Sequence, residues 1–164
     1  MRVRPKPKPK LKLERTFDAS IDDVWELCTT REGIESWWGP EGFSVAVRDL
    51  DLRPGGELVY EMTANGADQI EYMTQAGMPL LTVQRLTFEQ VDPPRRLVYK
   101  DLADFIPGVE PYQVETVIEL TEVEDGVRMV LTFDAMHDDH WTKMATLGRE
   151  SELEKLAQLL AARQ

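Results

Sequence analysis

Arg149 is the residue whose charge and position together suggest chemistry most strongly. It lies four residues before Leu153 and seven before Leu156, a spacing that places side chains on one face of a helix. An arginine on such an apolar face must reach water, pair with an acid or bind an anionic ligand, because its guanidinium is always charged. The sequence leaves these three roles open.

Aromatic and methionine side chains occupy the expected inward faces of several strands. They are Tyr60 and Met62, Tyr99, Tyr112, and Met129 with Phe133. Such a face suits an adaptable apolar pocket with a few hydroxyl hydrogen bonds, although each residue alone also fits ordinary core packing. Trp37 and Trp38 point about 100° apart on a helix, and we assign Trp38 to the pocket. The predicted ligand-binding residues are Trp38, Tyr60, Met62, Tyr99, Tyr112, Trp141 and Arg149.

Other reactive residue types occur without the spacing that their chemistry needs. The segment His137–His140 contains two histidines and two aspartates, but the chain has no third histidine and aspartates favour the start of a helix. Cys28 has no histidine nearby in sequence, which favours a small buried side chain over a nucleophile. The turn Arg53–Gly56 precedes a strand rather than the helix of a phosphate site. We therefore predict no metal site, no cofactor and no catalytic residue.

Charge is distributed unevenly along the 164 residues. The first twelve positions hold six basic residues and no acid, and without those six charges the net charge of −11 becomes −17 for residues 13–164. A body this acidic repels phosphate backbones, which argues against nucleic acid as a ligand. Residues 1–10, with prolines alternating with lysines, are predicted to be a disordered basic tail, either a solubilising end or an arm for an acidic partner.

The remaining composition, 42% hydrophobic and 30% charged, fits a single domain over residues 11–162. No apolar run approaches the ~20 residues of a membrane span, and no apolar stretch follows the N-terminal charges as a secretory signal requires. The single cysteine fits a reducing compartment. We therefore expect a cytoplasmic protein.

Periodicity locates the elements that position the candidate residues. Two short helices are expected after the first strand, capped by Ser20 and Thr30, and an extra short helix is expected at 67–76, with Ile70, Met73 and Ala76 on one side. A long helix runs from Asp138 or Asp139 to residue 160. The predicted strands are 11–17, 43–47, 58–62, 81–91, 96–102, 112–122 and 127–134.

Strands joined by short turns are antiparallel, and a single long amphipathic helix must bury its apolar stripe against one face of their sheet. The prediction is an α+β fold in which a curved antiparallel sheet of about seven strands surrounds the long C-terminal helix. A concave sheet around one helix tends to leave a cavity between them, so this architecture predicts binding of a small molecule.

Four motifs stand in one order along the chain: RTFDA at 15–19, WWGPEGF at 37–43, DLRPGG at 51–56 and PPRRLVY at 93–99. This ordered set, spread over residues 13–160, resembles the START-like (SRPBCC) superfamily in its bacterial branch named after the activator of heat-shock-protein-90 ATPase. The resemblance implies a helix-grip fold with a hydrophobic ligand cavity. Relatives commonly carry a tryptophan where this chain has Arg149, and many lack the helix at 67–76.

The expected function is therefore binding of a hydrophobic or amphipathic small molecule between the sheet and the last helix. Two alternatives stay open: a cyclase- or hydrolase-type enzyme that uses a tyrosine or carboxylate in the same cavity, and an interaction domain that modulates a chaperone. The expected partner is a small hydrophobic ligand, with neither nucleic acid nor a membrane span, and a homodimer stays open.

Overall fold

The computed structural model describes residues 9–104 and 106–163, so most of the basic segment predicted as a tail lies outside the described residues. Strand β1 (Lys10–Phe17) begins one residue earlier than expected. The Lys10 ammonium pairs with the Asp134 carboxylate at 2.7 Å, and this contact anchors the first residue of the strand on its neighbour β7.

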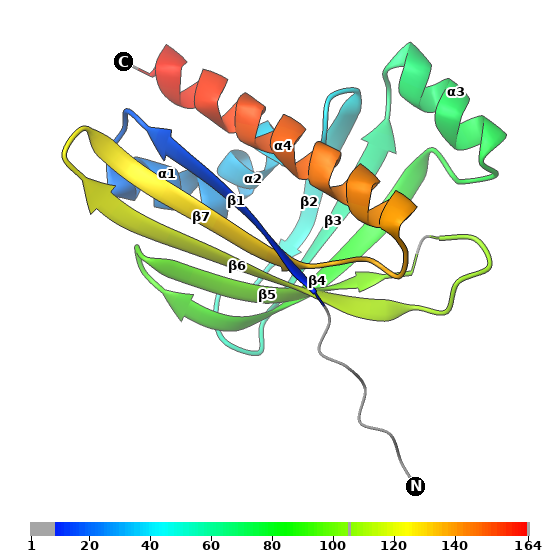
Figure 1. The fold of residues 1–164 in the computed structure, drawn as a ribbon, viewed down its shortest axis with the longest axis horizontal. Helices are drawn as coiled ribbons and strands as arrows, with labels where there is room; N and C mark the ends of the chain where they lie inside the picture. Colours follow the sequence, from blue (N-terminus) through cyan, green and yellow to red (C-terminus); the bar gives the residue numbers. More distant parts are fainter. Residues whose placement is uncertain (1–8, 105, 164) are drawn as a thin grey trace, which may run out of the picture.

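Seven strands form one antiparallel sheet in the order β1-β7-β6-β5-β4-β3-β2, and the long helix α4 lies diagonally across it (Figure 1). This arrangement confirms the predicted α+β helix-grip architecture. The remaining strands are β2 (Phe43–Leu50), β3 (Glu57–Ala64), β4 (Leu81–Asp92), β5 (Arg96–Ala103), β6 (Tyr112–Val123) and β7 (Gly126–Asp134). The helices are α1 (Ile21–Thr29), α2 (Arg31–Trp37), α3 (Ala67–Gln75) and α4 (Asp139–Ala162).

Side-chain caps start three of the helices at the positions expected from the sequence. The Ser20 hydroxyl accepts the amide of Asp23 in α1 at 3.1 Å, and the Thr30 hydroxyl accepts the amide of Gly33 in α2 at 3.0 Å. At α4 the Asp138 carboxylate accepts the amide of Trp141 at 2.8 Å. Each cap satisfies an N–H group that has no partner inside its own helix, so these polar residues determine where the helices begin.

The core lies between the concave face of the sheet and the helices. Leu153, Leu156 and Leu160 of α4 are buried there, whereas Trp141 and Ala145 in the first half of the helix are only half-buried. The second half of α4 therefore packs closely, and its first half leaves space above the sheet. None of the described helices is long and apolar enough to cross a lipid bilayer.

Candidate ligand-binding cavity

A cavity of about 620 Å³ lies between the sheet and α4. Side chains from β3, β4, β5, β6 and β7 form its floor, and the first half of α4 forms its roof. The end of α2 and the inserted helix α3 contribute the remaining wall. Most of this wall is apolar, as shown by Phe43, Met62, Leu131, Met136 and Trp141.

Six of the seven residues predicted from the sequence line this cavity, and Tyr112 does not. Strand alternation accounts for the residues on the sheet, because inward-facing positions recur at every second residue. The predicted residues that line the cavity are Trp38, Tyr60, Met62, Tyr99, Trp141 and Arg149.

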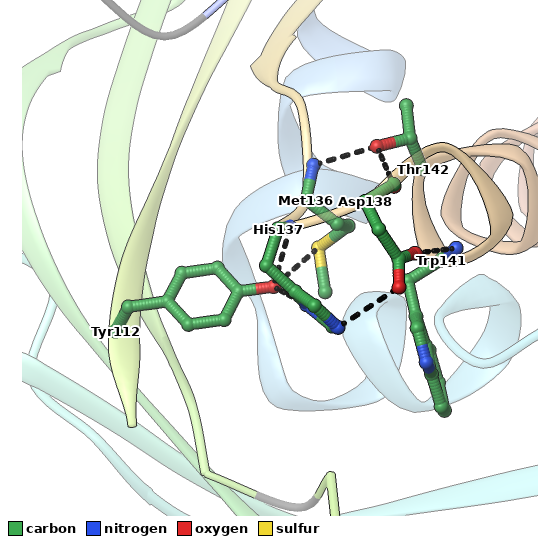
Figure 2. Close-up of polar contacts among 6 residues, drawn as sticks. All are labelled: Tyr112, Met136, His137, Asp138, Trp141 and Thr142. Atoms are coloured by element: carbon green, nitrogen blue, oxygen red, sulfur yellow. Dashed lines mark hydrogen bonds and ion pairs between the residues drawn. The ribbon is translucent and has the colours of Figure 1, made fainter. Parts of the chain in front are cut away.

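Tyr112 is instead the first residue of β6, and its hydroxyl contacts the segment that precedes α4 (Figure 2). Its hydroxyl oxygen lies 2.9 Å from His137 Nδ1 and accepts the His137 backbone N–H at 3.2 Å. It also approaches the Met136 sulfur at 3.7 Å. By strand alternation Tyr112 shares the inward-facing side of β6 with the residues that form the cavity floor. It stands at the end of the strand, however, beyond that floor.

The histidine- and aspartate-containing segment next to Tyr112 organises the start of α4 (Figure 2). The Asp138 carboxylate caps the helix and also lies 3.4 Å from His137 Nε2. The Thr142 hydroxyl accepts the backbone N–H of Met136 at 2.9 Å and donates to the Asp138 carbonyl at 2.7 Å. These bonds show a structural role for the aspartate at position 138.

Arg149 lies on the cavity wall, where an internal hydroxyl and an aromatic face hold it. Its Nη2 donates to the Thr116 hydroxyl at 2.9 Å, and the guanidinium carbon lies 4.3 Å from the centre of the Phe133 ring. No carboxylate of the described residues lies within ion-pair distance of the guanidinium. The sequence left three roles open for Arg149. The structure shows no close ion pair between it and an acid of the described residues, so contact with water and binding of an anionic ligand are the two roles that are left.

Two carboxyl groups that the sequence reasoning missed border the cavity near Arg149. Asp101 follows Tyr99 by two residues on the inward face of β5, and Glu152 follows Arg149 by one helical turn. Burial raises the pKa of Asp101 to about 7, although the charge of Arg149 lowers it. Burial also raises the pKa of Glu152, against the effects of Arg149, the Gly39 amide and a nearby lysine.

The two neighbouring tryptophans have different surroundings. The Trp37 indole N–H donates to the Leu27 carbonyl at 2.8 Å inside the core. The Trp38 indole nitrogen is buried and has no hydrogen-bond partner among the described residues. The Trp38 ring packs edge-on against Tyr60, with ring centres 5.5 Å apart, and lies 5.7 Å from the centre of Tyr99.

Tyr60 and Tyr99 present hydroxyl groups in the same region. Burial raises the pKa of both phenols, and their pKa values also respond to the charges of Asp101, Glu152 and Arg149, which places all five groups in one electrostatic neighbourhood. Both phenols therefore stay protonated and can donate hydrogen bonds. We call Trp38, Tyr60, Tyr99, Asp101, Arg149 and Glu152 the polar cluster.

Helix α3 forms part of the cavity mouth, but through other residues than expected. Tyr72 and Met73 line the cavity, whereas Ile70 and Ala76, expected on the same side of the helix as Met73, are exposed. The large hydrophobic side chains that are exposed among the described residues all lie in or near the mouth segments 70–83 and 144–147. They are Ile70, Tyr72, Leu80, Leu81, Val83, Met144 and Leu147.

Cys28 lies away from this cavity wall, within the core. Burial raises the pKa of its thiol to about 12, so the reactive thiolate is hardly present at neutral pH. This agrees with the expectation of a small buried side chain.

Several solved structures share this fold. A protein of Chromobacterium violaceum is 22% identical and superposes with a TM-score of 0.75, covering 92% of this chain and 96% of that one. The AHSA1 protein from Silicibacter pomeroyi is 21% identical with a TM-score of 0.71, over 95% and 100% of the two chains. A protein of Mycobacterium smegmatis is 23% identical with a TM-score of 0.72, over 94% and 92%.

A search of curated proteins finds no match. At these identities the solved structures establish the fold alone. The family comparison goes further, because one model matches residues 18–161, from the end of β1 to nearly the end of α4. The chain therefore belongs to the family described as Activator of Hsp90 ATPase homolog 1-like protein.

Proposed function

We propose that this protein binds an amphipathic small molecule whose apolar body lies against the cavity wall and whose polar group meets the polar cluster. The observation that carries the proposal is the position of unpaired polar groups inside an apolar cavity. Arg149 uses one of its five N–H donors on Thr116, and the hydroxyls of Tyr60 and Tyr99 have no hydrogen-bond partner among the described residues. Such donors favour a ligand that carries a carbonyl or carboxylate acceptor.

The size of the cavity supports the same class of ligand. Pockets that enclose small organic molecules usually measure about 300–1,000 Å³, with a mainly apolar wall and a few polar groups that fix orientation. The volume of about 620 Å³ lies within this range. The single, buried cysteine supports a reducing compartment such as the cytoplasm for this activity.

A cavity-filling substitution tests the proposal. Ala145 lines the cavity from α4, so Ala145→Phe should occupy ligand space, whereas Ala46→Phe makes the same change at an exposed position of β2. Titration with the apolar fluorescent probe anilinonaphthalene sulfonate should show at least about tenfold weaker binding (~1.4 kcal/mol) for Ala145→Phe only. Native mass spectrometry should find a small molecule retained by the unmodified protein and lost from this variant.

Equal probe affinity for both variants, with circular dichroism showing both to be folded, would contradict binding in this cavity. The same conclusion would follow if the unmodified protein bound neither the probe nor any co-purified small molecule.

A further inference from the structure

The strand register places Asp101 beside the group that holds Arg149. Tyr99 of β5 pairs directly with Thr116 of β6, and Asp101 pairs with Val114, two residues before Thr116. Diagonal neighbours of this kind are about 7–8 Å apart, within reach of a long side chain. Because the Arg149 guanidinium is bound to the Thr116 hydroxyl, one carboxyl and one fixed positive charge face the same part of the cavity.

The two acids of the polar cluster are held differently. Glu152 accepts the Gly39 backbone N–H at 2.7 Å, which fixes its carboxylate at the end of α2. Asp101 makes no hydrogen bond or ion pair with any of the residues that the structure describes, so its carboxyl can meet a ligand. The charged or titratable groups that face Asp101 are Tyr60, Tyr99, Arg149 and Glu152.

A carboxyl group without a protein hydrogen-bond partner, close to hydrogen-bond donors, is the arrangement needed to remove a proton from a carbon atom. A general base takes the proton, and hydrogen-bond donors stabilise the negative charge that develops on a neighbouring oxygen. A pKa of about 7 for Asp101 means that both its charged and its neutral form are present near neutral pH, as efficient proton transfer requires. Arg149 from α4 and the protonated hydroxyls of Tyr60 and Tyr99 from the sheet supply donors to the same cavity.

We propose that the cavity catalyses proton transfer at the carbon next to a carbonyl group in an apolar ketone, with Asp101 as the base. This inference rests on the proposed function, because the ketone must first bind in the cavity. It names a reaction class of the isomerase kind, in which a proton leaves one carbon and returns to the same carbon or to a conjugated one.

The electron and proton balance of the step closes without any further reactant. The Asp101 carboxylate takes a proton from the carbon, and the C–H electron pair forms a carbon–carbon double bond. The carbonyl π electrons move onto oxygen, where the donors of Arg149, Tyr60 and Tyr99 stabilise the enolate charge. Asp101 then returns a proton to the same carbon or to a conjugated one, and the carbonyl forms again.

Hydrogen–deuterium exchange of the apolar bicyclic ketone β-tetralone tests this step. In deuterium oxide the unmodified protein should replace the hydrogens next to the carbonyl faster than buffer alone, as followed by proton NMR. Asp101→Asn should lower the protein-catalysed rate at least about 100-fold, the smaller end of typical general-base contributions. Glu154→Gln, at an exposed acid of α4, is the matched control and should keep the full rate.

Binding of β-tetralone is measured for each protein alongside its exchange rate, by quenching of tryptophan fluorescence. The exchange rate should rise with pH up to about 7 and then level off, because Asp101 must lose its proton to act as a base. A merely structural role of Asp101 would not produce this profile.

Bound β-tetralone with no exchange above buffer, or equal exchange by Asp101→Asn and the unmodified protein, would overturn the catalytic inference and leave the binding function intact. Absence of β-tetralone binding would overturn the ketone as the substrate class. The proposed function itself fails on its own tests: equal probe affinity of Ala145→Phe and Ala46→Phe, or uptake of neither the sulfonate probe nor any co-purified molecule.

Discussion

Replacing Asp101 by asparagine should stabilise the protein, and by more as the pH rises. The substitution keeps the size and polarity of the side chain but removes a charge that burial makes unfavourable. One unit of pKa corresponds to about 1.4 kcal/mol. A carboxyl raised from 3.8 to about 7 is therefore destabilising by up to about 4 kcal/mol when ionised, or about 2 kcal/mol if water in the cavity solvates it.

The sign of the pH dependence follows from where the proton binds more tightly. Below about pH 4 both the folded and the unfolded states carry the proton on Asp101, so the charge has no effect on stability. Between about pH 4 and pH 7 the unfolded chain loses the proton while the folded protein retains it, and stability falls as the pH rises. Above this range both states are ionised and the unfavourable contribution stays constant.

Urea denaturation followed by tryptophan fluorescence at pH 5 and pH 8 measures the effect. The stability advantage of Asp101→Asn over the unmodified protein should grow by roughly 2 kcal/mol between these conditions. Asp104→Asn, at an exposed position just after β5, is the control for the same chemical change. A constant difference between the two pH values, or a loss of stability at pH 8, would refute burial of an uncompensated carboxyl at position 101.

Other variants test single contacts of the cavity. Arg149→Met should weaken binding of decanoic acid, measured by titration calorimetry, by about 1.5–3 kcal/mol, the usual contribution of a hydrogen bond to a charged group. Tyr72→Ser should also weaken this binding because Tyr72 lines the mouth, whereas Ile70→Ser should not, and equal effects would contradict a role for α3. Trp37→Phe should lower the free energy of unfolding by about 1–3 kcal/mol, since a backbone carbonyl loses its buried donor. Trp38→Phe should cost less, because its N–H has no partner to lose, and equal denaturation midpoints would contradict this difference.

The sequence predicted the elements well because their signals are local. The hydroxyls of Ser20 and Thr30 and the carboxylate of Asp138 mark helix starts through bonds to amides only a few residues away. Strand ends were less accurate where the regular alternation breaks. β2 was expected to end at Val47, but a register shift between Val47 and Asp49 lets pairing continue to the end of the strand. Such a bulge inverts the inward–outward alternation, so its continuation is invisible to a period-two pattern.

The sequence predicted the polar cluster except for its two carboxyl groups, Asp101 and Glu152. Tyr60 and Tyr99 could be placed on the inner face by alternation, but the same reasoning treats an acid as a solvent-facing residue. Asp101 lies two residues after Tyr99 in β5, so strand alternation places its side chain on the same inward face. This spacing was the feature of the sequence from which Asp101 could have been found. How far α4 stands from the sheet depends on packing among elements distant in the sequence, so neither the exclusion of Tyr112 from the wall nor the approach of Glu152 to it could be predicted.

The distribution of unpaired groups is the strongest reason to regard the cavity as functional. Elsewhere in the core, polar atoms are satisfied: the Trp37 N–H and the Thr29 hydroxyl both have backbone carbonyl partners. Among the described residues, the one buried side-chain nitrogen or oxygen without a partner belongs to Trp38, in the polar cluster. The unheld carboxyl of Asp101 lies in the same cluster. A fold selected for stability alone could replace these groups with apolar side chains that fill the cavity, since buried unpaired polar groups and empty volume both destabilise. Their concentration at one place, beside a fixed guanidinium, therefore supports the proposed binding of a ligand in this cavity.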